Sequence, residues 1–395
     1  MVPLGPITAA DGTPLKKKLA QALFRSRVRA VSLVVPLLAF VMASFVIPIF
    51  ALMWQGVYND RFSTYTPNLT EQLSKWDGLG EPDEALFMAL VADLKKARKD
   101  RTIGRIATRV NQEYPGTRSL FTSTARKAKK LKAPFKESII KTNKKWANIE
   151  VWRAMKLTSQ DLTPSFYATA LDGRYTVDKG FVKQNENRQI YVKLFWRTFM
   201  ISATVMALCL LLGYPVAYLL ATLPLRSSNL LMIMVLLPFW TSLLVRTTAW
   251  IAILQSQGVV NDLLVWIGIT SDESRFSLIY NMTGTIVAMT HILLPFMILP
   301  LYSVMKTIPP TYMRAARSLG ATPTLAFVKI YMPQTIPGVG AGGLLVFILA
   351  IGYYITPALV GGQDGQLISN MIAYHMQKSL NWSLAAALGG ILLAG

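Results

Sequence analysis

Few side chains in this sequence could carry covalent or metal chemistry. The chain has one cysteine, Cys209, inside an apolar run, and two histidines, His291 and His375, far apart along the chain. A single thiol forms neither an intrachain disulfide nor a thiolate metal cluster, and two distant imidazoles do not suggest a metal site. We therefore expect both histidines to serve packing or interfacial roles, and we expect this chain to bind no metal or cofactor of its own.

The glycine patterns typical of nucleotide-binding sites do not indicate such a site in this sequence. The segment from Gly338 to Gly343 fits the dinucleotide spacing, but it opens an apolar stretch and no strand precedes it. Gly338 and Gly342 lie four residues apart, which favours close helix packing through small residues. The phosphate-binding pattern Gly-x4-Gly-Lys-Ser/Thr does not occur in the sequence. Any ATP and Mg²⁺ that the function needs must therefore be held by another chain, so we expect a non-catalytic subunit.

The segment with the clearest functional signature is the polar loop 306–337. Pro310 suits the first turn of a helix, and Gly320 stands where a left-handed C-terminal cap favours a residue without Cβ. Thr322 can cap a second helix that Pro323 opens. Ala315 and Ala316 are small enough for the first helix to seat closely against another protein, and Arg314 and Arg317 leave it positive and polar. The loop is therefore expected to be a helix-turn-helix docking element.

A second group of residues lies where apolar helices should be interrupted. Four prolines, Pro238, Pro295, Pro300 and Pro357, lack the N–H that would pair with a backbone carbonyl of the helix. At membrane depth, an unpaired carbonyl is tolerated only where it faces protein or a water-filled cavity. Arg246 is the only charge well inside an apolar span; it could face a pathway or snorkel to the interface. We expect a translocation pathway near the following residues, although packing would also explain the aromatic ones: Trp240, Arg246, Tyr353, Tyr354, Thr356 and Pro357.

The elements that must position these residues are membrane helices. The chain has 395 residues, of which 52% are hydrophobic and only 15% charged, and a helix needs roughly 20 apolar residues to cross a bilayer. Five segments meet this length: Val31–Trp54, Phe199–Leu223, Leu230–Leu254, Thr283–Met305 and Gly338–Val360. A sixth, Trp382–Gly395, is too short to cross, and we expect its span to be truncated here.

Charge asymmetry predicts the orientation of these spans. The first 30 residues carry a basic cluster before an apolar run too long for a signal peptide, so it is predicted to be an uncleaved first span with a cytoplasmic N-terminus. The loop 306–337 contains basic residues and no acid, whereas the loop 255–282 contains three acids against Arg275. The former is expected in the cytoplasm and the latter outside.

Residues 55–193, between the first and second spans, form a polar insertion that this topology places outside the membrane. Pro82 and the acids after it open a helix with leucines at spacing four, and a second helical stretch runs from Thr124 to Leu157 with a break at Pro134. Most of the 41 Lys and Arg residues behind the net charge of +21 lie here, without any nucleic-acid-binding motif. We expect a small helical domain that either contacts a partner or anionic lipid, or is a solvated cap.

The loop 306–337 resembles the EAA loop of bacterial ABC importer permeases, whose pattern is Glu-Ala-Ala, three residues, Gly, nine residues, Ile, one residue, Leu, Pro. The matching positions are Ala315, Ala316, Gly320, Ile330 and Pro333, with Met332 in place of Leu and Arg314 in place of Glu. The resemblance implies that this helix docks in a groove of an ATP-binding subunit and transmits its closure to the membrane helices. The charge reversal at Arg314 changes any ion pair made there.

The segments 238–250 and 353–362 resemble those of spermidine/putrescine-type permeases, and the resemblance runs from about Phe195 to the end of the chain. It implies an all-α integral membrane protein of the bacterial inner membrane, with the fold of a type I ABC importer permease: a core domain 194–395, about six transmembrane helices and a helical extracytoplasmic insertion after the first. Implied partners are ABC ATPase subunits, a second permease and an external solute-binding protein. The implied solute is a polyamine, or another small organic solute such as an amino-acid derivative or opine.

Two other classes of membrane protein compete with this interpretation. An ion-coupled secondary transporter would need intramembrane acids or inverted repeats, and the five predicted spans contain no Asp or Glu. A receptor could use the insertion as its sensor, but it would leave the helix-turn-helix loop unexplained. An importer subunit is therefore the function that the sequence favours.

Overall fold

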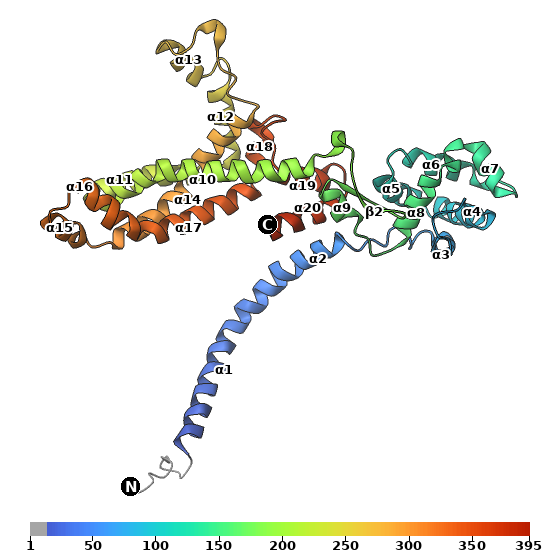
Figure 1. Ribbon diagram of the computed structural model, residues 1–395, viewed down its shortest axis with the longest axis horizontal. Helices are drawn as coiled ribbons and strands as arrows, with labels where there is room; N and C mark the ends of the chain where they lie inside the picture. The colour runs from blue at the N-terminus through green and yellow to red at the C-terminus, as the bar shows by residue number, and fades with distance from the viewer. Residues whose placement is uncertain (1–13) are drawn as a thin grey trace.

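The computed structural model describes residues 14–395, so the basic N-terminal segment 1–30 is described only from residue 14. Among the described residues, five helical segments are long and apolar enough to cross a membrane, which is the number expected. They are Lys17–Gln55, Tyr191–Thr222, Leu243–Trp266, Met282–Thr307 and Pro323–Gly352. The architecture is all-helical apart from one short hairpin. Figure 1 shows a helical body, a projecting N-terminal helix and a separate helical domain.

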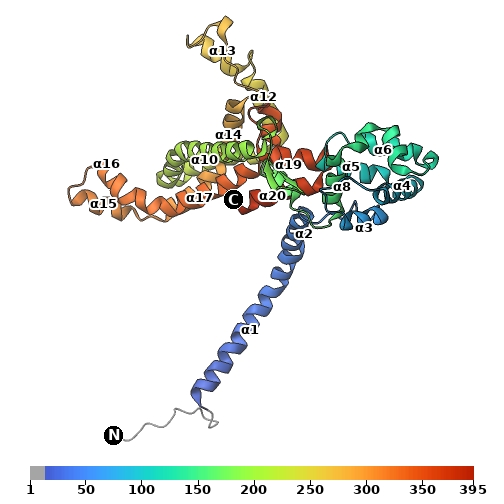
Figure 2. The same ribbon diagram turned by 45° about the vertical axis from the view of Figure 1, so that its right-hand side comes forward.

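The first span is one unbroken helical rod. It comprises α1 (Leu15–Val41), a π-helical turn (Met42–Val46) and α2 (Ile47–Gln55). None of its most apolar stretch is buried by the rest of the chain, and Leu33 is 81% exposed. The rod leaves the body at α2 and projects away from it in both views (Figures 1 and 2). An apolar rod of this kind requires lipid or another protein along its length.

Three long helices form the core of the membrane domain: α10 (Tyr191–Thr222), α14 (Met282–Thr307) and α17 (Met332–Gly352). They pack on one another side by side. The expected role of the small residues is confirmed, because a Cβ at Gly338 would lie 3.1 Å from Val304 Cβ, and one at Gly342 would lie 2.9 Å from Met297 Sδ. The glycines therefore let α17 approach α14 closely.

The predicted third span, Leu230–Leu254, is wrong as a single helix. The chain forms α11 (Leu225–Leu236), a 3₁₀ turn (Leu237–Trp240) and, after an extended Thr241, α12 (Leu243–Leu254). Pro238 lies in the turn and has no N–H to continue the helical ladder, so the chain changes direction here. In Figure 1, α12 rises away from α10 and continues into α13 (Val259–Trp266).

The expected interruption at Pro357 is present, whereas those at Pro295 and Pro300 are not. The helix α17 ends at Gly352, and after Tyr353 and Tyr354 the short α18 (Ile355–Val360) begins. Both prolines of α14 lie inside a continuous helix. The remaining C-terminal helices are α19 (Ile368–Gln377) and α20 (Trp382–Ala394).

The insertion folds as a small domain with its own core, predominantly helical as expected. Its helices are α3 (Pro67–Lys75), α4 (Glu84–Lys99), α5 (Ile103–Glu113), α6 (Arg118–Lys127), α7 (Phe135–Thr142), α8 (Ile149–Ser159) and α9 (Ser165–Ala170). Asp83 caps α4 by accepting a hydrogen bond from Leu86 N. An antiparallel hairpin, which the sequence analysis did not anticipate, pairs β1 (Gly173–Thr176) with β2 (Gly180–Lys183).

Two tryptophans fill the centre of the insertion. Trp146 and Trp152 are fully buried, and their rings lie 5.8 Å apart. Each indole N–H has a partner: Trp146 donates to Thr124 Oγ1, and Trp152 donates to the backbone oxygen of Trp146, both at 2.9 Å. The domain therefore has a packed, satisfied core rather than the character of a loose loop.

Candidate functional site

The predicted helix-turn-helix between the fourth and fifth spans is present. Helix α15 (Pro310–Ser318) starts with Pro310 in its first turn, and Gly320 has φ +89°. The N–H of Ala321 donates to the carbonyl of Ala316 at 3.1 Å, which closes a glycine-type C-terminal cap. Thr322 then accepts a hydrogen bond from Leu325 N and caps α16 (Pro323–Ala326). Local sequence rules therefore determine the shape of the loop.

The residues assigned to docking lie on the outside of this loop. Arg314, Ala315, Gly320 and Pro333 are exposed and Ala316 is half-buried, while Ile330 is 38% exposed. Leu319 projects beside them with 89% of its surface exposed. An exposed leucine next to two small residues is typical of a surface that another protein covers.

An aromatic cluster, which the sequence analysis did not identify, joins the loop to α10. Phe327 and Tyr331 stack within a π-helical turn (Phe327–Tyr331), with ring centroids 5.5 Å apart. Tyr218 of α10 meets both rings edge-on, each at 5.3 Å. The pairs Tyr214/Tyr218 and Phe327/Tyr331 each have helical spacing of four, which is the signal that could have revealed them. The cluster packs the loop against a core membrane helix.

A cavity of about 860 Å³ lies between the loop and the helix ends. Lys306, Arg314 and Arg317 line it and no carboxylate does. The cavity and the docking face therefore share one sign of charge.

The predicted pathway residues meet only in part. Thr356 is fully buried, and its hydroxyl lies 3.4 Å from that of Thr247, beside Arg246 in α12. The half-buried Arg246 has an Nε without a hydrogen-bond partner in the described part of the chain. Pro357 is buried at the start of α18. A threonine pair and a partly unsatisfied guanidinium thus lie where α12 meets α18, just after the break that ends α17.

The aromatic candidates are more dispersed. The backbone carbonyls of Tyr353 and Tyr354, freed by the helix break, accept hydrogen bonds from Ser369 Oγ at 2.5 Å and from Asn370 Nδ2 at 2.8 Å. Trp240 is 77% exposed, so it does not join the buried group.

Sequence analysis missed His291 as a neighbour of this group. Trp250 Nε1 donates to His291 Nδ1 at 3.1 Å, and Trp250 lies one helical turn beyond Arg246. His375 has the expected structural role: its ring nitrogens contact Tyr191 Oη at 3.0 Å and Ser379 Oγ at 2.9 Å. Both histidines therefore have side-chain partners within the described chain.

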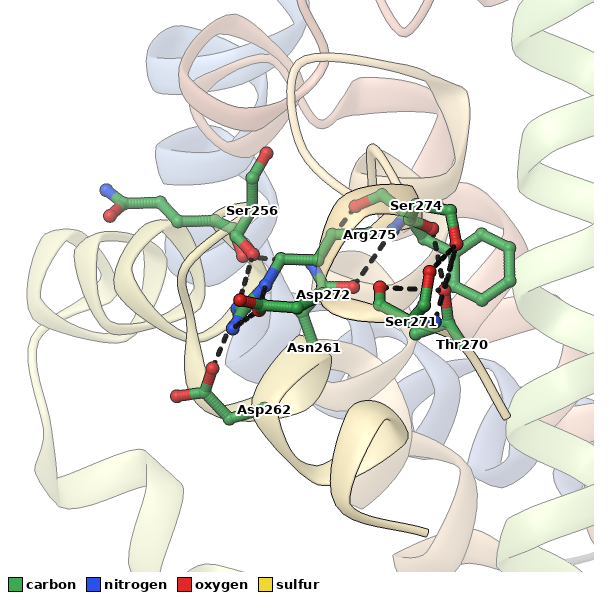
Figure 3. Close-up of polar contacts among 10 residues, drawn as sticks. Ser256, Asn261, Asp262, Thr270, Ser271, Asp272, Ser274 and Arg275 are labelled. Atoms are coloured by element: carbon green, nitrogen blue, oxygen red, sulfur yellow. Dashed lines mark hydrogen bonds and ion pairs between the residues drawn. The ribbon is translucent and has the colours of Figure 1, made fainter. Parts of the chain in front are cut away.

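The loop 255–282 forms a projecting arm held by Arg275 (Figure 3). Its guanidinium pairs with Asp262 at 2.7 Å and Asp272 at 2.6 Å, and donates to the carbonyl of Ser256 at 2.9 Å. Hydrogen bonds to the two carboxylates raise the pKa of Arg275. Asn261 completes the network, donating to the carbonyl of Phe276 and accepting from its N–H. The arm is thus internally braced.

The braced arm presents apolar side chains to its surroundings. Trp266 is 82% exposed, Val259 68%, Ile269 61% and Leu263 54%. A rigid arm with this much exposed apolar surface is a candidate contact surface.

Comparison with known proteins agrees with the geometry of the C-terminal half. Residues 210–395 match the model of a family described as binding-protein-dependent transport system inner membrane component. The spermidine/putrescine transport system permease protein PotB of Escherichia coli K12 is 37% identical over 179 residues, covering 45% of this chain and 64% of that protein. PotB of Haemophilus influenzae is 34% identical over 199 residues, covering 50% of this chain and 69% of that protein.

The chain spans 62% of the length of PotB from Salmonella typhimurium SL1344. Among solved structures, a bacterial ABC transporter that imports the acidic polysaccharide alginate aligns with a TM-score of 0.40 and 20% identity, covering 53% of this chain and 77% of that one. The family match begins after the insertion and includes the loop, α12 and the broken end of α17. The chain belongs to the family of binding-protein-dependent transport system inner membrane components.

Proposed function

We propose that this chain is a permease subunit of an ATP-driven importer, forming half of the pathway for a small organic solute of the polyamine class. The observation that carries the proposal is the loop between α14 and α17. Its docking helix is capped by Gly320 at φ +89° and exposes small and apolar residues, while its inner side packs on α10 through Tyr218. A separate ATPase subunit binds ATP and Mg²⁺ and hydrolyses the ATP.

The ATPase partner should carry carboxylates facing this loop. Between residues 306 and 337 there are four basic residues and no acid. Arg314 is exposed on the docking helix, at the position where similar permeases have Glu. Complementary charge steers association and excludes wrong partners. We infer that the groove of the cognate ATPase is acidic at this point.

The other partners follow from the exposed apolar surfaces. A second permease would cover the membrane faces that one chain leaves open, and a solute-binding protein would dock on the outer side, where the arm of Val259–Trp266 projects. The N-terminus is then cytoplasmic, and the chain spans the bacterial inner membrane several times.

The polyamine assignment is supported by the names of the relatives. The group formed by Arg246, Thr247 and Thr356 sets a condition on it. Arg246 would repel a cationic solute, and α10, α12, α14 and α17 contain no Asp or Glu to offset it. Carboxylates that bind a polyamine would therefore come from the second permease or the binding protein. The unsatisfied Nε of Arg246 favours a second candidate, a solute with a carboxylate such as an amino-acid derivative or opine.

The test is uptake by the chain co-expressed with its neighbours in the genome and reconstituted in vesicles. We expect ATP-dependent uptake of labelled putrescine or spermidine that an inactive ATPase variant abolishes and ionophores do not. Uptake of carboxylate-bearing amino-acid derivatives instead would establish the second candidate. Flux that persists without ATP and collapses with an ion gradient would refute the importer, and solute binding by the insertion without any flux would favour a receptor.

A further inference from the structure

A cavity of about 580 Å³ lies where the insertion meets the loop between α19 and α20. Three parts of the chain that are distant in sequence build it: the segment after the first span, helix α5 with the start of α6, and the α19–α20 loop. Its lining includes Arg61, Arg105, Arg109, Arg118 and Lys378. Every charged residue in the lining is basic.

Arg109 makes this more than a basic surface. Its side chain has no exposed area, and its one ion pair joins Nη1 to Glu113 at 2.7 Å. Nε and Nη2 have no hydrogen-bond partner within the described residues. A buried N–H without a hydrogen-bond partner is destabilising. The face of Phe166, 4.7 Å from the guanidinium, offsets this only in part.

The other cations are held around this buried group. Arg105 donates to Tyr65 Oη and lies over the tyrosine ring, which orients its guanidinium. In the part of the chain that the structure describes, Arg109 is the one cation of the set with an ion pair. The remaining four concentrate positive charge without neutralising partners, an arrangement that attracts an anion.

The cavity lies close to the ends of two apolar helices. Arg61 lies two residues after Asn59, whose Nδ2 donates to Ser383 Oγ of α20 at 3.0 Å. Lys378 directly follows α19, α20 begins at Trp382, and α2 ends at Gln55. The membrane surface is therefore within reach of the site.

We propose that this cavity binds a phosphate-type oxyanion, either the headgroup of an anionic lipid or free phosphate. Guanidinium groups bind phosphate oxygens in a bidentate manner, which suits the three exposed arginines, Arg61, Arg105 and Arg118, around the buried Arg109. Binding would join the insertion to the α19–α20 loop through the anion. The site is independent of the importer function and is tested separately from it.

The test uses the purified full chain and two probes. Inorganic phosphate is titrated against the detergent-solubilised chain, and protection of α5 and α19 from hydrogen exchange is measured in nanodiscs of phosphatidylcholine with and without phosphatidylglycerol. The double variant Arg61→Gln/Lys378→Gln changes two exposed groups and leaves the buried Arg109 intact. We expect it to weaken binding by roughly tenfold or more, because charge-assisted hydrogen bonds are lost.

The matched control is Lys129→Gln/Lys130→Gln, which removes the same charge from exposed residues of the same domain. If the chain binds free phosphate and only Arg61→Gln/Lys378→Gln loses this binding, the result supports a soluble anion as the ligand. Protection that appears only with phosphatidylglycerol and is lost in the same variant supports a lipid headgroup. Equal losses in both variants, or binding of neither probe, would overturn the proposal.

Discussion

At the scale of single residues, Gly320 is the clearest test of the docking loop. A side chain there would meet no atom within 4 Å, so a substitution strains only the backbone at φ +89°. Gly320→Val should cost about 1–2 kcal/mol at a left-handed residue. We expect less solute transported per ATP hydrolysed by the assembled complex. Gly340→Val, a helical glycine that also has open space, is the control; an unchanged ratio for Gly320→Val would contradict the coupling role.

Asp93 gives a prediction about pH. It is fully buried and accepts hydrogen bonds from Leu69 N at 2.8 Å and Asn68 Nδ2 at 2.7 Å. Burial raises the pKa of this carboxyl, although the hydrogen bonds oppose the shift. The folded insertion therefore holds the proton more readily than the unfolded chain, and the contribution of Asp93 to stability declines as pH rises above about 4.

The measurement is hydrogen exchange of α3 and α4 in the full chain and in Asp93→Asn, at several pH values and corrected for intrinsic exchange rates. The stability of the wild type relative to the variant should fall as pH rises from 4 towards neutral. A difference that stays constant would show that the pKa of Asp93 is not shifted.

At the scale of elements, the approach of α17 to α14 depends on Gly338. A side chain there would press on Val304 Cβ and on Leu301 Cα, which lies 3.3 Å from the position of a Cβ. Gly338→Leu should destabilise the membrane domain by about 1–3 kcal/mol through overpacking. Gly340→Leu, on the same helix but facing open space, should have little effect. Thermal unfolding in detergent followed by size-exclusion chromatography compares the two, and equal losses would contradict close packing as the cause.

Arg275 should determine the rigidity of the projecting arm. Replacing it by Met removes two ion pairs and the bond to Ser256; both carboxylates are largely exposed, so we expect a local loosening of the arm and only a small change in global stability. Amide exchange in α13 should become several-fold faster. Glu273→Gln, which alters charge in the same turn without touching this network, should leave exchange unchanged. Slow exchange in Arg275→Met would mean that the arm is braced by its backbone instead.

Sequence patterns predicted elements best where short-range physics decides. The capping of the docking loop by Gly320 and Thr322 depends on a few neighbouring residues, and the small-residue face of α17 on spacing alone. The prediction of Leu230–Leu254 as one helix was wrong because mean hydropathy averages over Pro238, where the ladder of helical hydrogen bonds stops. The contact of Trp250 with His291 arises from the packing of α12 on α14, which no local pattern encodes.

At the scale of the whole molecule, the described chain has the surfaces of a subunit. The first span is unburied along its most apolar stretch, the arm carries exposed apolar residues, and the docking loop exposes Leu319. These surfaces lie on different sides of the body (Figures 1 and 2). Lipid can cover the first span and also the apolar helix of the arm, which belongs to the candidate span Leu243–Trp266, whereas the docking loop is polar at its edges and suits a protein. The arrangement therefore favours an assembly with partners at several faces.

The orientation of that assembly can be tested with thiols. Cys209, the only cysteine, is fully buried, so the unmodified chain should label weakly with a membrane-impermeant maleimide and serves as the control. Lys130→Cys in the insertion and Ser318→Cys in the docking loop both replace exposed residues. The positive-inside rule places the insertion outside and the loop inside. We expect Lys130→Cys to label in intact spheroplasts and Ser318→Cys only after permeabilisation; the reverse would place the docking loop where no ATPase can reach it, and the importer proposal would fail with the topology.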